Sequence, residues 1–180
     1  KYKLFISDYD RTLGDRDFVD ASTVDMIKEY ERRGGKFVIV SGRVIDSITR
    51  ICKMYGFTGL VGAYQGAMIK DVETGKIHFH VGVDKKTAIE VVKQFFIDNY
   101  DTTIDIEGVR YSVKGDGIFL DHYLKFGGAV ENLISREEAL RKMQDTTGII
   151  EKVCAMISPE NVYTQMEKYS KMFPDYVAFN

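Results

Sequence analysis

The sequence lacks tryptophan, has two cysteines and two prolines, and carries no excess of charge of either sign. The cysteines, Cys52 and Cys154, lie far apart and show no metal-binding spacing, so we expect two reduced core thiols. Lys and Arg number 25 against 27 Asp and Glu, which gives a formal charge of −2. Nucleic-acid-binding proteins need clustered excess Lys and Arg, so no nucleic-acid partner is expected.

Long hydrophobic runs are also missing. No apolar stretch approaches the roughly 20 residues that cross a bilayer, so no membrane partner is expected. The first residues, Lys1 to Ile6, lead straight into an acidic motif without a cleavage site, and this predicts that a signal peptide is absent. What is present is an ordinary globular balance of 44% hydrophobic and 29% charged residues. The composition therefore predicts a cytoplasmic protein of one ordinary domain or two small ones.

The first 83 residues alternate short apolar runs with helical periods. Three buried strands are predicted, at residues 3–7, 36–40 and 60–63. Two helices are predicted between them, at 22–33 and 44–55, and a glycine follows each helix. This strand-helix-strand-helix-strand order predicts a parallel sheet with right-handed crossovers.

The pattern changes after a predicted β-hairpin at 68–81, which has Gly75 in its turn. The order expected from there is helix, two strands, short helix, strand, helix and strand. These elements are predicted at 84–99, 103–106 and 109–113, then after the capping residue Ser135, and at 149–157, 158–172 and 176–179. This is an α+β unit, so we expect a domain boundary that divides the chain into 1–83 and 84–180.

The most informative residues, Asp8-Tyr9-Asp10-Arg11-Thr12, follow the first predicted strand. Carboxylates just past the carboxyl end of a buried parallel strand lie where open α/β sheets bind ligands. Clustered carboxylates can hold Mg²⁺, which prefers oxygen ligands. One carboxylate can also attack an electrophile and form an aspartyl phosphate, while the other transfers protons.

A second motif, Ser41-Gly42-Arg43, follows the second predicted strand and leads into a helix. A hydroxyl, the N–H groups of a glycine-containing turn and a helix N-terminus together make a phosphate cradle. Either motif alone is weak evidence, but their position at the ends of successive parallel strands favours a phosphate site. A nearby acidic group could extend a metal site, although a polar loop and helix capping explain it better; its members are Asp15, Asp17 and Asp20.

These residues resemble three motifs of the haloacid dehalogenase-like (HAD) phosphohydrolases. The run from Asp8 to Leu13 is similar to the first motif, DxDxT. Ser41-Gly42-Arg43 is similar to the second motif in the T/S-G-R form of the Cof-type subgroup, and the run from Tyr64 to Ile69 is similar to that subgroup's N-G-A-x-I segment. The resemblance covers the whole chain. It implies an α/β fold in which part of a Rossmann-like core with a parallel sheet, residues 1–83, carries an inserted α+β cap domain, residues 84–180.

The resemblance also implies roles for these residues. Asp8 would be the nucleophile and a Mg²⁺ ligand. Asp10 would be the general acid/base and would bind the metal through its backbone carbonyl. The transferring phosphate would contact Tyr9, Thr12, Ser41 and Gly42. The implied cofactor is therefore Mg²⁺, and the implied partner is a small phosphorylated substrate.

The sequence departs from the family pattern at several points. Arg11 stands where the motif usually has glycine, and Gln65 replaces the usual asparagine. Together with Arg43 and Gly66, these two residues are candidates for substrate contact. The family also uses a lysine from a third motif and an acidic pair from a fourth, and neither has a match in the 180 residues. We therefore expect an N-terminal portion of a longer enzyme, with little or no turnover by itself.

Three functions remain open at this point. The leading hypothesis is a Mg²⁺-dependent phosphohydrolase of small phosphomonoesters, such as a sugar phosphate or a nucleotide, that works through an aspartyl phosphate. A hexose phosphomutase would share DxDxT and a similar cap, and stimulation by a sugar bisphosphate would distinguish it. A non-catalytic phosphate-binding or phosphoacceptor module is the third hypothesis, and Thr12 together with Ser41-Gly42-Arg43 argues against it.

Overall fold

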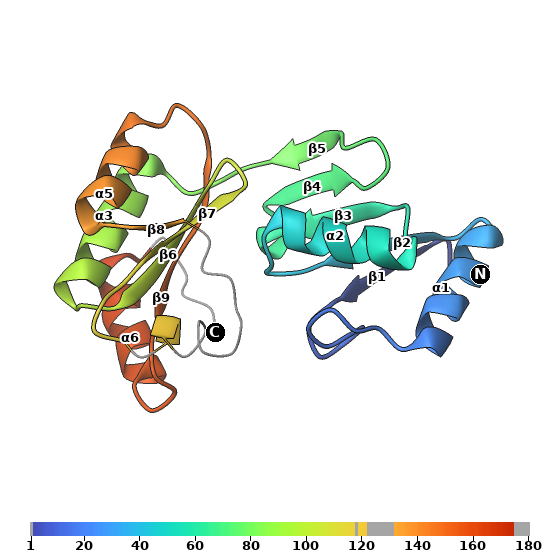
Figure 1. Cartoon of the computed structure of the whole chain (residues 1–180), viewed down its shortest axis with the longest axis horizontal. Helices are drawn as coiled ribbons and strands as arrows, with labels where there is room; N and C mark the ends of the chain where they lie inside the picture. The colour runs from blue at the N-terminus through green and yellow to red at the C-terminus, as the bar shows by residue number, and fades with distance from the viewer. Residues whose placement is uncertain (1, 118, 122–131, 175–180) are drawn as a thin grey trace. The chain divides into compact units, whose positions relative to one another are not determined.

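The computed structural model of the chain describes residues 2–117, 119–121 and 132–174. The chain divides into two compact units, Lys1–Gly82 and Val83–Asn180. Each unit has its own sheet and its own hydrophobic core (Figure 1). The strand predicted at 176–179 lies outside the described residues.

The first unit is built on a five-stranded sheet with the order β1-β2-β3-β4-β5. Its strands are β1 (Leu4–Asp8), β2 (Lys36–Val40), β3 (Leu60–Ala63), β4 (Met68–Asp71) and β5 (Ile77–His80). The first three strands pair in parallel, whereas β4 and β5 add an antiparallel hairpin. The predicted α/β class is therefore confirmed, because the short apolar runs form the parallel strands and the segment around Gly75 forms the hairpin turn.

Two helices make the crossovers between the parallel strands, α1 (Ala21–Arg32) and α2 (Ile45–Tyr55). The carboxylate of Asp20 caps α1 by accepting the N–H of Ser22 at 2.9 Å, as the capping interpretation of this acidic residue predicted. Helix α2 ends at Gly56, whose φ of 71° is a left-handed conformation that suits glycine. The start of α1 and the end of α2 therefore lie at the capping residues that the sequence pattern indicates.

Helices α1 and α2 contribute to one core with the strands that they connect. From α1 the buried residues are Val24 and Ile27, and from α2 they include Ile48 and Ile51. These pack in the same cluster as Phe37 and Ile39 of β2. Because this core fixes β2 between the helices and its neighbouring strands, it also fixes the loop that follows β2.

Strand β1 lies at the edge of this sheet among the described strands. The ring of Phe5 contacts the ring of Phe37 at a centroid distance of 5.5 Å, so this position alternates toward the helix-covered face. Leu4 and Ile6 alternate to the opposite face, and all three side chains stay about half exposed, at 51%, 50% and 56% for Leu4, Phe5 and Ile6. The strand that ends at Asp8 is therefore supported mainly through its pairing with β2.

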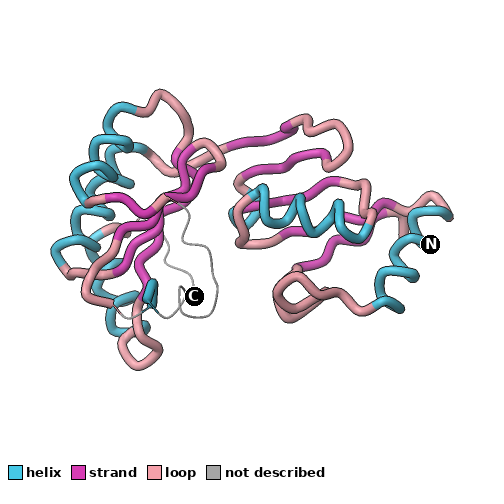
Figure 2. The backbone as a smooth tube through the Cα atoms, in the orientation of Figure 1, coloured by secondary structure: helices cyan, strands magenta, loops and turns pink. Residues whose placement is uncertain are grey.

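In the described residues of the second unit, a four-stranded sheet and three helices contribute to one core. Figure 2 distinguishes the helices and strands of this unit by colour. The strands are β6 (Asp101–Ile106), β7 (Val109–Val113), β8 (Leu133–Ile134) and β9 (Ile150–Met156), in the order β8-β7-β6-β9. The helices are α3 (Lys85–Ile97), α5 (Arg136–Asp145) and α6 (Val162–Met172). Strand β6 pairs antiparallel with both β7 and β9, and β7 pairs in parallel with β8.

Two features of this unit differ from the sequence prediction. Strand β8 was not predicted, because two residues carry no periodicity. The last helix begins at Val162 and not at Pro159, since the N–H of Asn161 donates to the carbonyl of Ser158 in a turn that precedes the helix. The predicted cap of α5 is confirmed, because the Ser135 side chain accepts the N–H of Glu138.

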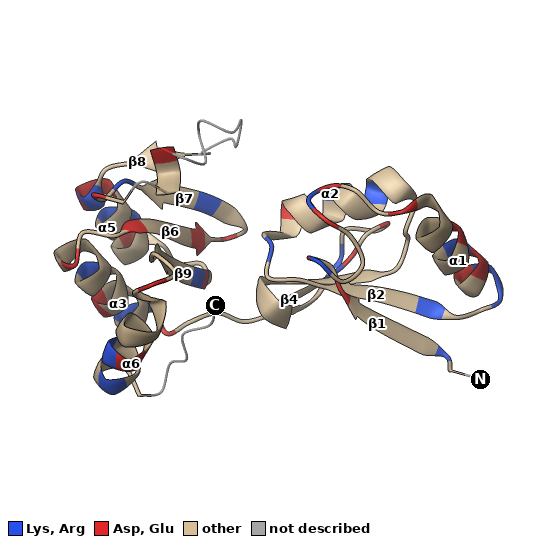
Figure 3. Cartoon of the chain, turned by 90° about the horizontal axis from the view of Figure 1, so that it is seen from below, with Lys and Arg blue, Asp and Glu red and all other residues tan. Residues whose placement is uncertain are grey.

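Charged residues of both signs are distributed along the helices (Figure 3). On α1, for example, the Glu29 carboxylate accepts from Arg32 and from Arg33, each at 2.6 Å. Such exposed pairs contribute little to stability but keep the helix surface hydrated. Within the described ranges, no helix combines the length and the apolar character needed to cross a bilayer.

Removing Ile48 should test the core that holds the loop after β2. Ile48 is fully buried, so Ile48→Ala should lower the free energy of unfolding of the first unit by about 2–5 kcal/mol through lost apolar burial and a cavity. Met54 on the same helix is 55% exposed, and Met54→Ala is the matched control with an expected loss below about 1 kcal/mol. Urea titrations followed by NMR signals of α2 measure both, and equal losses would contradict the assigned core.

Candidate functional site

The chain turns sharply directly after β1. The carbonyl of Tyr9 accepts the N–H groups of Thr12, Leu13 and Gly14 at 3.2, 3.0 and 3.0 Å. This turn places Arg11 in the left-handed region with a φ of 61°. Glycine adopts that conformation without strain, which accounts for the glycine usually found at this position of the motif.

Asp8 ends β1 and lies opposite Val40 in the parallel register, beside the point where β2 passes into Ser41. The side chain is exposed, and its Oδ2 accepts a hydrogen bond from the Thr12 hydroxyl at 2.9 Å. One carboxylate oxygen is thus oriented by the turn that follows the strand. An exposed, oriented carboxylate at a strand end can attack an electrophile or bind a cation.

Asp10 is bound by two residues of the loop after β2. The Arg43 guanidinium donates from Nε to both carboxylate oxygens at 3.1 Å and from Nη2 to Oδ1 at 2.6 Å. The hydroxyl of Ser41 donates to Oδ2 at 3.2 Å. The hydrogen bond from Arg43, followed by the charge of Arg43 and the bond from Ser41, outweighs desolvation and holds the pKa of Asp10 below its usual value. Asp10 is therefore an anion with both oxygens engaged.

The loop from Ser41 to Arg43 connects β2 to the N-terminus of α2. Ser41 is buried, its N–H donates to the carbonyl of Gly62 at 2.9 Å, and its hydroxyl accepts the N–H of Arg43 at 3.2 Å. The N-cap residue of α2 is Val44, which makes no side-chain cap hydrogen bond. The first N–H groups of α2 thus lack the usual side-chain acceptor, and helix N-termini of this kind favour anions.

A third segment, Tyr64–Gly66, is tied to the same loop. The N–H of Tyr64 donates to the carbonyl of Arg43 at 3.1 Å, and the N–H of Gln65 donates to the carbonyl of Ser41 at 3.0 Å. Tyr64 and Gln65 have φ values of 52° and 55°, and Gly66 follows at 92°. Two consecutive non-glycine residues in the left-handed region store strain, which persists only where surrounding contacts enforce it.

The side chain of Gln65 lies against Gly42. A Cβ added at Gly42 would stand 2.7 Å from the Gln65 amide nitrogen, so glycine allows this close approach. The structure therefore brings Gln65 together with Ser41, Gly42 and Arg43. Arg11 is exposed in the neighbouring turn, where its charge also contributes to lowering the pKa of Asp10.

Tyr9 lies beneath the Arg43 guanidinium. The Arg43 Cζ atom is 4.8 Å from the centroid of the Tyr9 ring, a cation–π distance. Tyr9 is fully buried, and desolvation raises the pKa of its hydroxyl. Its side chain thus supports the arginine, while its carbonyl organises the turn after β1.

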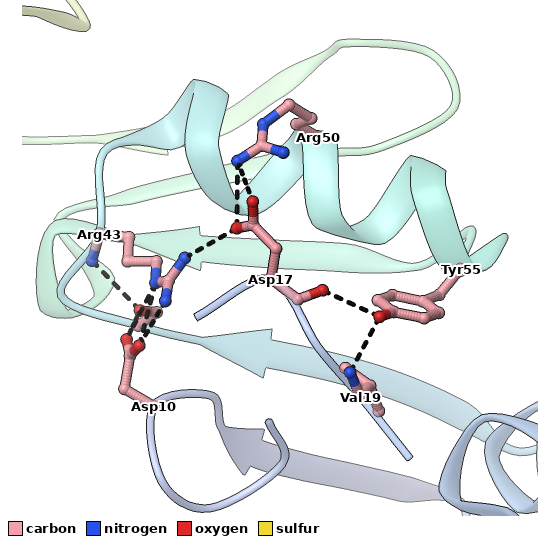
Figure 4. A network of polar contacts seen from close by, with 7 residues as sticks. Asp10, Asp17, Val19, Arg43, Arg50 and Tyr55 are labelled. Atoms are coloured by element: carbon pink, nitrogen blue, oxygen red, sulfur yellow. Dashed lines mark hydrogen bonds and ion pairs between the residues drawn. The ribbon is translucent and has the colours of Figure 1, made fainter. Parts of the chain in front are cut away.

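Two residues next to the site, Arg50 and Tyr55, were not named from the sequence, and a third, Asp17, was interpreted there as part of a polar loop (Figure 4). Arg43 Nη1 lies 3.6 Å from Asp17 Oδ1, and Arg50 Nη2 donates to both oxygens of Asp17 at 3.1 and 3.0 Å. The Tyr55 hydroxyl donates to the Asp17 carbonyl at 2.8 Å. Arg50 lies on α2 whereas Arg43 precedes the helix, so no helical periodicity in the sequence links the two.

The available oxygen donors fit a hard cation. In the described ranges, no group of three or more His, Cys, Asp or Glu residues lies close enough to hold a metal. Mg²⁺ commonly keeps several waters and uses only one or two protein carboxylates together with substrate phosphate. The Asp8 carboxylate and the Asp10 carbonyl are donors of that kind, whereas both oxygens of the Asp10 carboxylate are occupied by Arg43.

Solved structures with the same fold are numerous. A structure from Thermotoga maritima superimposes on this chain with a TM-score of 0.75 and 22% sequence identity. The superposition covers 99% of this chain and 65% of the Thermotoga maritima chain. A HAD-like hydrolase from B. subtilis superimposes with a TM-score of 0.77 and 19% sequence identity, over 93% of this chain and 66% of the B. subtilis chain. A structure described as a HAD subclass IIB sugar phosphatase superimposes with a TM-score of 0.71 and 16% sequence identity, over 93% of this chain and 63% of the phosphatase chain. The chain thus spans about two thirds of the length of these structures.

Sequence comparison adds the family. A search of curated protein sequences finds no match. The family model of haloacid dehalogenase-like hydrolases, however, matches residues 5–177 and so includes the turn after β1, the loop after β2 and most of the second unit. The resemblance seen in the three motifs is confirmed by this match and by the shared fold. The chain belongs to the haloacid dehalogenase-like hydrolases.

Proposed function

We propose that this chain acts as a Mg²⁺-dependent phosphohydrolase of the Cof type on small phosphomonoesters, through an aspartyl phosphate on Asp8. One observation carries the proposal. The exposed Asp8 carboxylate, held by Thr12, ends the strand next to the one that leads into Ser41, Gly42 and the N-terminus of α2. A nucleophile beside an anion-binding helix terminus is the arrangement that phosphoryl transfer needs.

The first step is an attack by an Asp8 carboxylate oxygen on the substrate phosphorus. A new bond forms between Asp8 and phosphorus, and the bond to the leaving-group oxygen breaks. That oxygen takes up a proton, which solvent water supplies while Arg43 holds the Asp10 carboxylate. Thr12 fixes the other oxygen of Asp8 and so limits the rotation of the nucleophile. Mg²⁺, held by the Asp8 carboxylate and the Asp10 carbonyl, would reduce the repulsion between carboxylate and phosphate.

The second step returns the enzyme to its starting state. Water attacks the phosphorus of the aspartyl phosphate, the bond to Asp8 breaks, and inorganic phosphate leaves. Asp10, kept ionised by its contacts with Arg43 and Ser41, accepts the proton from this water and then releases it to solvent. Donation of a proton to the leaving group by Asp10 would require the contact between Arg43 and Asp10 to open first.

The transferring phosphate is held by the loop after β2. The Gly42 N–H would donate to the phosphate, the Ser41 hydroxyl would turn its hydrogen from Asp10 to the phosphate, and the positive end of the α2 dipole favours the phosphate charge. The family resemblance implies that Tyr9 and Thr12, in the turn after β1, also contact this phosphate. Arg43 was a candidate for substrate contact in the sequence analysis. In the structure its guanidinium forms an ion pair with Asp10.

We assign residues 84–180 the role of the cap domain that selects the leaving group. The support is the compact second unit with its own core, together with the match of the family model through residue 177. A sugar phosphate is the substrate class that we favour, since one of the similar structures is a sugar phosphatase. The 180 residues alone should show little or no turnover, because neither the lysine of the third motif nor the acidic pair of the fourth motif has a match in them.

Replacing Asp8 should abolish the covalent step. With Mg²⁺ and beryllium fluoride, a mimic of the aspartyl phosphate, the wild-type chain should give a bound ¹⁹F NMR signal that Asp8→Asn lacks. Hydrolysis of sugar phosphates should fall about 10³-fold or more, because the nucleophile is lost. Asp15→Asn makes the same charge change in the next loop and should keep the signal. A bound signal that survives in Asp8→Asn would contradict the assignment.

Replacing Ser41 should weaken the phosphate site. Loss of one hydrogen bond to an anion is worth about 1.5–3 kcal/mol, so Ser41→Ala should bind inorganic phosphate about 10- to 100-fold more weakly. Ser41→Thr keeps the hydroxyl and should bind nearly as the wild type does. Ser22→Ala, on the exposed surface of α1, controls for the loss of a hydroxyl elsewhere. Calorimetry with phosphate and Mg²⁺ measures all four proteins, and equal affinities would exclude Ser41 from the cradle.

A further inference from the structure

The loop between β1 and α1 contains a carboxylate that the proposed chemistry does not use, Asp17. It stands on the opposite side of the Arg43 guanidinium from Asp10. Arg43 binds Asp10 through Nε and Nη2, and its remaining nitrogen, Nη1, faces Asp17 at 3.6 Å (Figure 4). Arg43 is thus shared between two acidic residues of the chain segment that follows β1.

Asp17 is itself anchored at its side chain and at its main chain. Arg50 holds both carboxylate oxygens at 3.1 and 3.0 Å, and the Tyr55 hydroxyl holds the carbonyl at 2.8 Å. The same hydroxyl accepts the N–H of Val19 at 2.9 Å, and the Tyr55 ring stacks on Phe57 at 6.0 Å. The position of Asp17 is therefore set by α2 and by the core beneath it.

The guanidinium of Arg43 is fixed on three sides. It is a planar group, so its orientation is defined by the contacts of its two edges and its face. Asp17 lies at the Nη1 edge, the Tyr9 ring lies under the face at 4.8 Å, and the remaining edge then points at Asp10. Arg43 is 21% exposed, whereas Asp10 and Asp17 are each 48% exposed, so the arginine is the most buried of the three.

Single exposed ion pairs contribute little free energy, because ordering two long side chains costs entropy and water screens the charges. In the row Asp10, Arg43, Asp17, Arg50 the charges alternate, and each inner member has a partner on both sides. The side-chain entropy that Arg43 loses when it is ordered is then offset by two ion-pair contacts instead of one. Removal of Asp17 would leave Arg43 free to rotate its Nη1 edge, and Asp10 would lose a fixed partner.

We propose that Asp17 is a positioning residue, which orients the Asp10 carboxylate through Arg43 without touching the substrate. Its importance for catalysis rests on the proposed function, in which Asp10 accepts the proton of the attacking water. Because Asp17 lies behind Arg43 and not in the phosphate cradle, its loss should slow the proton transfer and leave phosphate binding nearly unchanged. Arg50 contributes indirectly, because it binds the Asp17 carboxylate and does not contact Asp10.

The test compares Asp17→Asn with Asp15→Asn, which removes the same charge from the same loop. Asp15 is joined to Phe18 by main-chain hydrogen bonds, so its carboxylate is a suitable control. In ¹H–¹⁵N spectra, the Nε–H signal of Arg43 should be sharp in the wild type and in Asp15→Asn, and broadened or lost in Asp17→Asn. Arg50→Met, which leaves Asp17 in place, should broaden the signal less.

Steady-state hydrolysis of a sugar phosphate supplies the second readout. Asp17→Asn should lower kcat about 10- to 100-fold, the loss expected from a misplaced catalytic group, with KM changed less than about twofold. A sharp Arg43 signal in Asp17→Asn would overturn the proposal, and so would a tenfold rise in KM at constant kcat. If the wild-type chain hydrolyses no phosphomonoester, in line with the low turnover expected of it, the Arg43 signal alone decides whether Asp17 positions this arginine. The proposed function fails if the wild-type chain gives no bound ¹⁹F signal with Mg²⁺ and beryllium fluoride.

Discussion

The contact between Arg43 and Asp10 is the interaction on which the site depends. It joins the turn after β1 to the loop after β2, two segments that are 33 residues apart in the chain. The same turn is also held by its own hydrogen bonds to the carbonyl of Tyr9, by the bond from Ser41 to Asp10 and by the β1–β2 ladder. The Arg43 contact adds an ion pair to these links, so that the carboxylate proposed as base and the loop proposed to hold the phosphate are fixed relative to each other.

That arrangement is supported by a backbone that is locally unfavourable. Arg11 and the pair Tyr64 and Gln65 adopt left-handed conformations that residues with a Cβ avoid. Main-chain hydrogen bonds to Ser41, Arg43 and Gly14 compensate for them. The strain thus occurs at the turns that surround the phosphate cradle, as expected where a backbone is fixed for a binding function and not for its own stability.

Much of this could be predicted from the sequence, because the parallel strands are short apolar runs and carboxylates at their ends have a known chemical use. Asp8, Asp10 and Ser41 were found in that way. The pairing of Arg43 with Asp10 was not predicted, since the direction of an arginine side chain depends on tertiary packing and leaves no periodic pattern in the sequence. Asp17 was interpreted as part of a polar loop for the same reason, although it contacts two arginines. Short elements such as β8 carry too few residues to produce a period.

The two hydrophobic clusters of the chain share no residue, one being built around Ile48 and the other around Val92. Cooperative unfolding requires that the loss of one part of a core destabilise the rest, and separate cores provide no such link. We therefore expect thermal unfolding in two events, one for each unit, and not a single melting temperature. A ligand of the phosphate cradle would stabilise the first event and leave the second where it was.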